Sequence, residues 1–323
     1  MKILFTRKIP QELLDPIKDD YEIVMWDQED VPMERERLLE EVADADAIFT
    51  NVSDAIDKEL MERAPMLKVI STMAVGYDNI DVAEATKRGI PVGHTPGVLT
   101  EAMADLTFAL LMATARRVVE GMDFIRGNEW QSWGPFLLTG QSLHRSTIGI
   151  IGMGRIGEGV ARRARGFEMN ILYHNRTRKL EAEKELGATY CSLEELLQQS
   201  DHVVLLAPST PETYHMIGRQ QFDLMKKTSV FINTSRGTNV DEQALYDALK
   251  EKKIFAAGLD VFELEPISND HPLLQLSNVT LLPHIGSANV ETRQNMANLA
   301  IANILKGLAN ERLPHAVNKE IYE

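Results

Sequence analysis

Short runs of apolar residues alternate with helical patterns from one end of the chain to the other. A first series of strands is expected at residues 2–6, 22–26, 47–50, 67–72 and 90–93. A second series opens at Ile148 and continues at residues 171–174, 203–207, 230–233, 256–259 and 280–282. Strands that alternate with helices predict an α/β fold with parallel sheets, because a parallel pair needs a crossover connection.

Helical patterns separate and close these two series. A turn signal at residues 95–97 precedes a long helix expected from Thr100 to Arg126, with Thr100 as its N-cap. Ser192 and Glu195 have the spacing of a capping box, which predicts a helix between two strands of the second series. A further helical pattern over residues 290–308 closes the chain.

A glycine-rich turn stands directly behind the apolar run 147–151. It contains Gly152, Gly154 and Gly157, and a helical pattern follows it. In such a turn the first glycine permits the tight bend, the second lets the backbone approach a pyrophosphate, and the third packs helix against strand. The helix N-terminus then offers free N–H groups to the anion. The pattern therefore predicts dinucleotide binding.

The position of this turn predicts the domain organisation. It opens the second series, so a Rossmann cofactor domain is expected over residues 99–287. Residues 1–98 and 288–323 are expected to form a flavodoxin-like substrate domain into which the Rossmann domain is inserted. Both domains should be doubly wound parallel sheets, and the two crossings between them would form a hinge beside the active site.

Composition narrows the class of protein further. A length of 323 residues with 44% hydrophobic residues is enough for two cores. The formal net charge of −14 argues against nucleic acids and anionic membranes as partners. The single cysteine, Cys191, excludes an internal disulfide and favours a reducing compartment. With no signal peptide or membrane span expected, we predict a cytoplasmic protein. The seven histidines other than His284 lack metal-ligand spacing with Cys, Asp or Glu, so no metal site is expected.

Three polar residues follow expected strands of the second series. Arg236 follows the strand at 230–233, Glu265 follows the one at 256–259, and His284 follows the one at 280–282. The carboxyl ends of parallel strands are where ligands bind in open α/β sheets. An arginine can bind a carboxylate or polarise a carbonyl, and a histidine can transfer a proton near neutral pH. A carboxylate beside the histidine would orient its ring and favour its protonated form.

The chain resembles the D-isomer-specific 2-hydroxyacid dehydrogenases along essentially its whole length. The matching segments are 73–81 (MAVGYDNID), 152–157 (GMGRIG), 206–212 (LAPSTPE), 233–237 (NTSRG), 258–266 (GLDVFELEP) and 282–286 (LPHIG). The resemblance implies that Arg236, Glu265 and His284 are the catalytic set. It also implies that the N–H groups of Val75 and Gly76 hold the substrate carboxylate.

Within that family, the segment 127–135 (GNEWQSWGP) looks most like the glyoxylate/hydroxypyruvate reductase branch, which includes 2-ketogluconate reductases. The resemblance implies NAD(P)H-dependent reduction of a small 2-oxo acid to the D-2-hydroxy acid. It also implies a homodimer formed through the cofactor domain, in which Trp133 reaches the partner's active site. A simpler alternative is that Trp130 and Trp133 are only apolar dimer contacts.

The segment after the second strand of the cofactor domain bears on the choice of cofactor. NAD sites usually carry an acid there for the ribose 2′-hydroxyl. This chain has Asn175, Arg176, Thr177 and Arg178 instead, so NADPH is expected to be preferred, with NADH still possible. The resemblance also implies that Asp260 contacts the nicotinamide carboxamide. The full set expected to contact the cofactor is Gly152, Gly154, Arg155, Ile156, Gly157, Asn175, Arg176, Thr177, Arg178, Pro208, Thr213, Thr234, Asp260, His284 and Gly286.

Two alternatives stay open at this point. One is a different specificity within the family, such as phosphoglycerate, formate or phosphonate dehydrogenation. The other is a nucleotide-sensing binding protein, because some transcriptional corepressors share this fold. The catalytic triplet argues against the second alternative.

Overall fold

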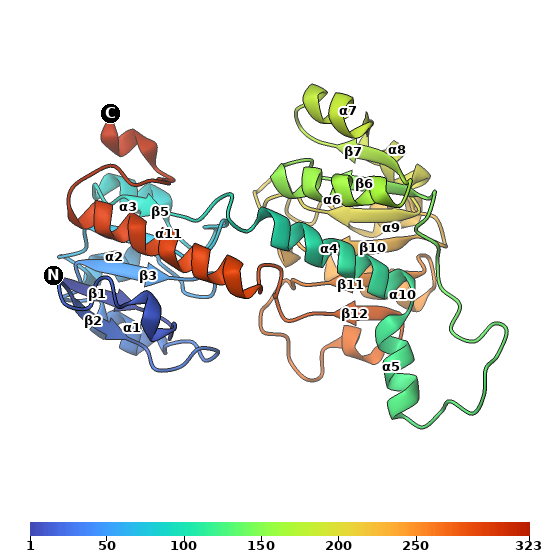
Figure 1. Ribbon diagram of the computed structural model, residues 1–323, viewed down its shortest axis with the longest axis horizontal. Coiled ribbons are helices and arrows are strands. Elements are labelled where there is room, and N and C mark those ends of the chain that lie inside the picture. Colours follow the sequence, from blue (N-terminus) through green and yellow to red (C-terminus); the bar gives the residue numbers. More distant parts are fainter. The chain divides into compact units, whose positions relative to one another are not determined.

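The computed structural model describes all 323 residues. The chain divides into two compact units, one formed by Met1–Leu99 with Asn289–Glu323 and the other by Thr100–Ala288. Each unit is built around its own parallel sheet (Figure 1). The predicted class, two parallel-sheet α/β domains, is therefore confirmed.

The first unit contains a five-stranded sheet in the order β2-β1-β3-β4-β5. This is the doubly wound order of flavodoxin-like folds. Two apolar clusters lie on opposite faces of the sheet, because adjacent residues along a strand point to opposite sides. The strands are β1 (Lys2–Phe5), β2 (Glu22–Met25), β3 (Ala47–Thr50), β4 (Val69–Thr72) and β5 (Val92–Gly93).

Helices cover both faces of this sheet. The long helix α11 (Val290–Leu308) returns from the far end of the chain and packs on β3 and β4 (Figure 1). It begins at Asn289, whose side chain accepts a hydrogen bond from the N–H of Thr292. The other helical segments are η1 (Gln11–Leu13), α1 (Arg35–Glu41), α2 (Lys58–Arg63), α3 (Val82–Lys87) and η4 (Lys319–Tyr322).

The second unit contains a seven-stranded parallel sheet in the order β12-β11-β10-β9-β6-β7-β8. The order reverses between β6 and β9, as in Rossmann folds, and ligands bind beyond the carboxyl ends of strands at such a point. The strands are β6 (Thr147–Ile151), β7 (Asn170–His174), β8 (Thr189–Tyr190), β9 (His202–Leu205), β10 (Val230–Asn233), β11 (Ala256–Leu259) and β12 (Val279–Leu281).

Seven α-helices and two short 3-10 segments accompany this sheet. They are α4 (Thr100–Ala115), α5 (Val118–Arg126), α6 (Arg155–Gly166), α7 (Leu180–Leu186), α8 (Leu193–Gln199), α9 (Arg219–Leu224), α10 (Glu242–Lys250), η2 (Gly237–Asn239) and η3 (Pro272–Gln275). The predicted capping box at α8 is confirmed, because Ser192 and Glu195 exchange side-chain-to-backbone hydrogen bonds of 3.0 and 3.2 Å. No helix in the chain is long and apolar enough to cross a membrane.

Two local predictions were wrong, and one strand was missed. The long helix expected over 100–126 is broken into α4 and α5 at Arg117, whose φ of 55° is left-handed. The guanidinium of Arg117 holds this break through two 2.7 Å bonds to Glu120. Thr100 is the first residue of α4 rather than its N-cap. The edge strand β8 was not predicted, because two residues are too short to show a period.

His202 is a buried histidine at the start of β9. Its Nε2 lies 3.0 Å from the carbonyl oxygen of Ser142, and its Nδ1 has no hydrogen-bond partner. Burial lowers the pKa of His202 below the usual histidine value, although the hydrogen bond to Ser142 and the charge of Asp201 act in the opposite direction.

The lowered pKa of His202 predicts a loss of stability in mild acid. Protonation of His202 is less favourable in the folded protein than in the unfolded chain. The free energy of unfolding should therefore fall as pH drops below about 6.5. Chemical denaturation between pH 8 and pH 5 measures this slope. A His202→Gln variant should show a shallower slope, whereas the exposed control His144→Gln should match the wild type. Equal slopes for all three proteins would contradict this role of His202.

Candidate active site

Three neighbouring parallel strands lead into the candidate catalytic residues. In the sheet β12 lies beside β11, and β11 lies beside β10. Arg236 follows β10, Glu265 follows β11, and His284 follows β12. The sequence therefore brings these residues to one edge of the sheet, because all three strands run in the same direction.

His284 and Glu265 form a direct pair. The Nδ1 atom of His284 lies 2.7 Å from Oε2 of Glu265, and each side chain is about one-third exposed, at 31% and 32%. The other carboxylate oxygen of Glu265 accepts the N–H of Phe262 at 2.9 Å. Burial opposes ionisation of Glu265, but the hydrogen bond and charge of His284 outweigh it and lower the pKa of this carboxyl. Nε2 of His284 is thus the ring nitrogen left for proton transfer to a ligand.

The backbone around His284 is tied to Asp260. His284 has a left-handed φ of 54°, a conformation that is uncommon for residues other than glycine. The next residue, Ile285, donates its N–H to Oδ1 of Asp260 at 2.8 Å. Asp260 itself is fully buried, and its Oδ2 has no hydrogen-bond partner within the chain. Burial raises the pKa of the Asp260 carboxyl.

Arg236 belongs to a turn that Asn233 organises. The Asn233 amide donates to the carbonyl of Arg236 at 3.0 Å, and its oxygen accepts the N–H of Ser235 at 3.0 Å. Arg236 is half-buried, and its charge contributes to the lowered pKa of Glu265. The next residue, Gly237, lies against the backbone of Phe262, where an added Cβ would come within 1.8 Å of the carbonyl carbon. Position 237 therefore requires glycine, because the segment after β10 crosses the segment after β11 there.

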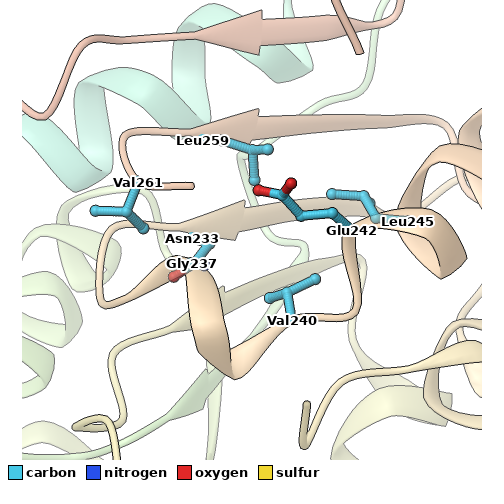
Figure 2. A pocket seen from close by; sticks show the side chains of 7 residues that line it. All are labelled: Asn233, Gly237, Val240, Glu242, Leu245, Leu259 and Val261. Carbon is cyan, nitrogen blue, oxygen red and sulfur yellow. The ribbon is translucent and has the colours of Figure 1, made fainter. Parts of the chain in front are cut away.

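Glu242 supports the same segment and was not identified from the sequence. Its Oε1 accepts the N–H of Glu263 at 2.8 Å, and its Oε2 lies 3.3 Å from Nε2 of His271. Figure 2 shows its carboxylate beside Leu259, in a pocket that has no room for a water molecule. This carboxylate therefore braces the chain just before Glu265. Its sequence position, at the first residue of α10, suggests only a favourable helix end.

The glycine turn has the geometry that its sequence predicts. Gly152 has a φ of +103°, and a Cβ there would meet the backbone of Leu206 at 2.7 Å. A Cβ at Gly157 would lie 2.5 Å from the carbonyl oxygen of Gly152. Gly154, in contrast, has no chain atom within 4 Å of an added Cβ. The space above Gly154 is open to a ligand, and α6 begins directly behind it.

The residues after β7 lie in three different surroundings. Asn175 faces the glycine turn, since its Oδ1 accepts the N–H of Met153 at 2.7 Å and its amide donates to the Met153 carbonyl at 3.3 Å. Arg178 instead forms two hydrogen bonds with Glu183, of 2.6 and 2.7 Å. Arg176 and Thr177 between them are exposed.

Other residues expected to contact the cofactor border the same region of the second unit. Thr213 closes the loop after β9, because its hydroxyl donates to the carbonyl of Pro208 at 2.7 Å. The hydroxyl of Thr234 lies 2.7 Å from that of Thr107 and is buried. Arg155 and Ile156 form the first turn of α6. Gly286 packs against Met103, whose sulfur would lie 2.3 Å from an added Cβ.

Val75 and Gly76 lie in the first unit, in the loop that follows β4. The carbonyl of Val75 lies 3.0 Å from Nδ1 of His94. Neither the N–H of Val75 nor that of Gly76 donates to another group of the chain. Both are thus available to an anionic ligand of this unit.

The face of α5 and the segment after it expose many apolar side chains. No residue of α5 is buried. Trp133 is 81% exposed, and the indole N–H of Trp130 donates to the carbonyl of Ser132 at 3.0 Å. Figure 1 shows α5 and this segment standing away from the seven-stranded sheet of their unit. A groove there is lined by Val118, Gly121, Met122, Phe124, Ile125, Trp130, Leu137 and Leu138.

The second unit fits a nicotinamide dinucleotide on two observations. The open space at Gly154 admits a pyrophosphate beside the N-terminus of α6. At the other end of the site, the buried and unpartnered Oδ2 of Asp260 offers an acceptor for a carboxamide N–H₂. No group of three or more His, Cys, Asp or Glu side chains in the structure is arranged to hold a metal ion.

The open space at Gly154 predicts a variant that folds but binds the dinucleotide weakly. Gly154→Ala adds a Cβ that has no chain atom within 4 Å, so the cost to stability should be at most about 1–2 kcal/mol from the altered N-cap. The dissociation constant for NADPH, measured by fluorescence titration, should rise at least about tenfold because the pyrophosphate loses its approach to the backbone. Unchanged binding by a folded variant would show that the pyrophosphate lies elsewhere.

The chain is similar in sequence to known proteins. Residues 108–286 match the family described as D-isomer specific 2-hydroxyacid dehydrogenase, NAD binding domain. The chain is 52% identical over 324 residues to the glyoxylate reductase of Thermococcus litoralis, an alignment that covers 99% of this chain and 97% of that protein.

Two solved structures show the same likeness. A protein from Thermus thermophilus has a TM-score of 0.92 at 44% identity, covering 98% of this chain and 100% of that one. The NADPH-dependent glyoxylate/hydroxypyruvate reductase of Sinorhizobium meliloti, in complex with NADP and malonate, has a TM-score of 0.84 at 34% identity. That match covers 98% of this chain and 96% of the other.

Proposed function

Because the chain belongs to the D-isomer-specific 2-hydroxyacid dehydrogenases, an oxidoreductase family with an NAD-binding domain, we propose that it reduces a small 2-oxo acid to the 2-hydroxy acid, in the D form where the product is chiral. The candidate substrates are glyoxylate, hydroxypyruvate and 2-ketogluconate. The observation that carries the proposal is the 2.7 Å pair of His284 and Glu265, beside the buried carboxylate of Asp260. The name of the Thermococcus litoralis relative supports glyoxylate as the first substrate to test.

The residues of the chain then have distinct roles. The nicotinamide cofactor, when bound, supplies the hydride that adds to the carbonyl carbon. Protonated His284 donates the Nε2 proton to the carbonyl oxygen, since Glu265 holds the ring through Nδ1. Arg236 binds the substrate carboxylate and polarises the carbonyl. The products are thus the hydroxy acid, the oxidised cofactor and a neutral imidazole, which is protonated again from solvent.

We also propose which unit binds which ligand. The second unit, Thr100–Ala288, holds the cofactor through the glycine turn and Asp260. The first unit contributes the substrate site through the free N–H groups of Val75 and Gly76, because two unpaired N–H groups in one loop form a favourable site for a carboxylate. Val75→Pro would remove one of these donors and should raise KM for the oxo acid while leaving cofactor affinity unchanged.

NADPH is the cofactor we propose as preferred, with weaker use of NADH. Asn175 stands where an NAD site usually has an acid, and the exposed Arg176 and Thr177 follow it. The Sinorhizobium meliloti relative, named as NADPH-dependent, supports this preference.

We further propose that a second copy of this chain covers the apolar face of α5. A helix with no buried residue in one chain, followed by Trp133 at 81% and Phe136 at 84% exposure, forms a contiguous apolar surface. Such a surface is typical of an interface between subunits. In the resulting dimer we place Trp133 at the partner's substrate site.

Light scattering tests the dimer, and steady-state kinetics test Trp133. The wild type should have twice the mass of one chain, and Ile125→Glu should shift it toward the monomer. Trp133→Ala should raise KM for the oxo acid in a protein that is still dimeric. A monomeric wild type would contradict the interface, and unchanged kinetics would leave Trp133 as a dimer contact only.

Absorbance at 340 nm tests the proposed function in one set of assays. The purified protein is mixed with glyoxylate, hydroxypyruvate or 2-ketogluconate, each with NADPH and with NADH. We expect rapid loss of absorbance with NADPH and slower loss with NADH. Loss with NADH alone would overturn the cofactor preference but keep the reductase, and no loss with any pair would contradict all three candidate substrates.

A further inference from the structure

The two arginines after β7 lie in different surroundings. Arg178 makes a two-point hydrogen-bonded ion pair with Glu183, with Nε–Oε1 and Nη2–Oε2 distances of 2.6 and 2.7 Å. Glu183 also accepts the hydroxyl of the buried Tyr173 at 2.7 Å. The same hydroxyl accepts the N–H of Lys179 at 2.7 Å. These bonds tie the segment after β7 to the first turns of α7.

Arg176 takes no part in this network. It is exposed, and its charge helps to lower the pKa of Glu212, after the hydrogen bond from Thr210 that contributes most. No hydrogen bond joins Arg176 to Glu212. The guanidinium of Arg176 can therefore turn toward a ligand without breaking an ion pair, whereas that of Arg178 cannot.

We propose that Glu183 is a specificity-determining residue of the cofactor site. Glu183 holds Arg178 in an ion pair with a structural role, and Arg176 is left to recognise a 2′-phosphate. This inference rests on the proposed function and deepens its cofactor preference. It assigns unequal roles to two arginines that the sequence presents as equivalent.

Electrostatics gives Glu183 a second effect. A dianionic 2′-phosphate that approached Arg178 would also approach the Glu183 carboxylate, which is firmly ionised. The hydrogen bonds from Arg178 and Tyr173 hold the pKa of Glu183 at about 2. Glu183 thus cancels much of the attraction that Arg178 would offer to the phosphate. The chain should consequently discriminate less strongly between NADPH and NADH than a site with two free arginines.

Binding of two mononucleotides isolates this effect from catalysis. 2′,5′-ADP carries the 2′-phosphate and 5′-AMP lacks it, so the ratio of their dissociation constants measures recognition of that phosphate alone. Isothermal titration calorimetry is carried out on the wild type, Arg176→Ala, Arg178→Ala and Glu183→Gln. Glu181→Gln is the matched control, because it removes the same charge from an exposed position of the same helix.

The expected pattern distinguishes the two arginines. Arg176→Ala should lose at least about tenfold in affinity for 2′,5′-ADP and leave 5′-AMP unchanged. Arg178→Ala should lower Tm, because Glu183 loses its ion-pair partner, and should change the two nucleotides equally. Glu183→Gln should tighten 2′,5′-ADP by about three- to fivefold at low salt, the scale of one exposed ion pair. This gain should shrink in about 0.5 M salt.

Each contrary result has a separate meaning. If the wild type binds 2′,5′-ADP and 5′-AMP equally, the proposed NADPH preference fails and this inference fails with it. If the preference holds but Arg178→Ala abolishes it as fully as Arg176→Ala, the division of roles alone is overturned. If Glu183→Gln behaves as Glu181→Gln does, Glu183 does not determine specificity.

Discussion

Replacing His284 with Asn should slow the reduction of a 2-oxo acid by about 10²–10⁴-fold, the usual contribution of a general acid. Asn keeps a polar side chain at the site but has no proton to give at neutral pH. The loss should fall on kcat and on kcat/KM together, because the proton moves only in the transition state. Stopped-flow and steady-state assays at 340 nm measure both, and the dissociation constant for NADPH should stay near that of the wild type.

The pH profile gives this prediction a second readout. Reduction needs protonated His284 and oxidation needs the neutral ring, so the two directions should have opposite trends with pH. The rate of reduction should fall on the alkaline side of its pH profile, and Glu265 should not contribute to this alkaline limb. Burial raises the pKa of the Glu265 carboxyl, but the hydrogen bond and charge of His284 outweigh burial and lower it. His284→Asn should remove the limb.

A second histidine–glutamate pair provides the matched control. His215 lies 2.9 Å from Glu263 and is similarly exposed, but it has no assigned role in the reaction. His215→Asn should retain most of the activity. Near-normal turnover by His284→Asn, or an equal loss in both variants, would reject His284 as the proton donor.

Replacing Arg236 with Gln should lower kcat/KM for the oxo acid by about 10²–10³-fold, the cost of removing one donor aimed at developing charge. The glutamine keeps a hydrogen-bonding group but loses the charge and the planar fork that bind a carboxylate. KM should rise and kcat should fall, because the same group binds the carboxylate and polarises the carbonyl. Turns built by Asn233 should persist, since they use the backbone of this segment.

Arg219→Gln is the control for this variant. Arg219 is more than half exposed and pairs with Asp247 at 2.6 Å, so its loss removes one positive charge without touching the site. Circular dichroism and NADPH titration should show both variants folded and able to bind cofactor. A KM for the oxo acid that is unchanged in Arg236→Gln would mean that another group binds the carboxylate.

The sequence predicted the candidate site best where the positions of its residues follow from the parallel arrangement of strands. Parallel strands place their carboxyl ends together, so residues that follow β10, β11 and β12 had to meet at one edge. The pairing of His284 with Glu265 is the direct result. The conformation of the glycine turn could also be predicted, because an added Cβ at Gly152 or at Gly157 would clash with the backbone.

Features that depend on one particular backbone conformation or side-chain contact could not be predicted. The break between α4 and α5 depends on the backbone of Arg117, which a helical pattern does not reveal. In the sequence, Glu242 and Glu183 are ordinary acidic residues near the starts of helices. In the structure, Glu242 accepts a hydrogen bond from the backbone just before Glu265, and Glu183 forms an ion pair with Arg178. Only the folded chain brings these carboxylates to their partners.

Isotope transfer to hydroxypyruvate tests the central claim most directly. The protein is incubated with NADPH that carries deuterium at both C4 positions of the nicotinamide, and the product is analysed by mass spectrometry and chiral chromatography. We predict D-glycerate with one deuterium on C2, formed in step with the loss of absorbance at 340 nm and almost absent with His284→Asn. L-glycerate, a product without deuterium, or formation of labelled product by His284→Asn at the wild-type rate would contradict the account.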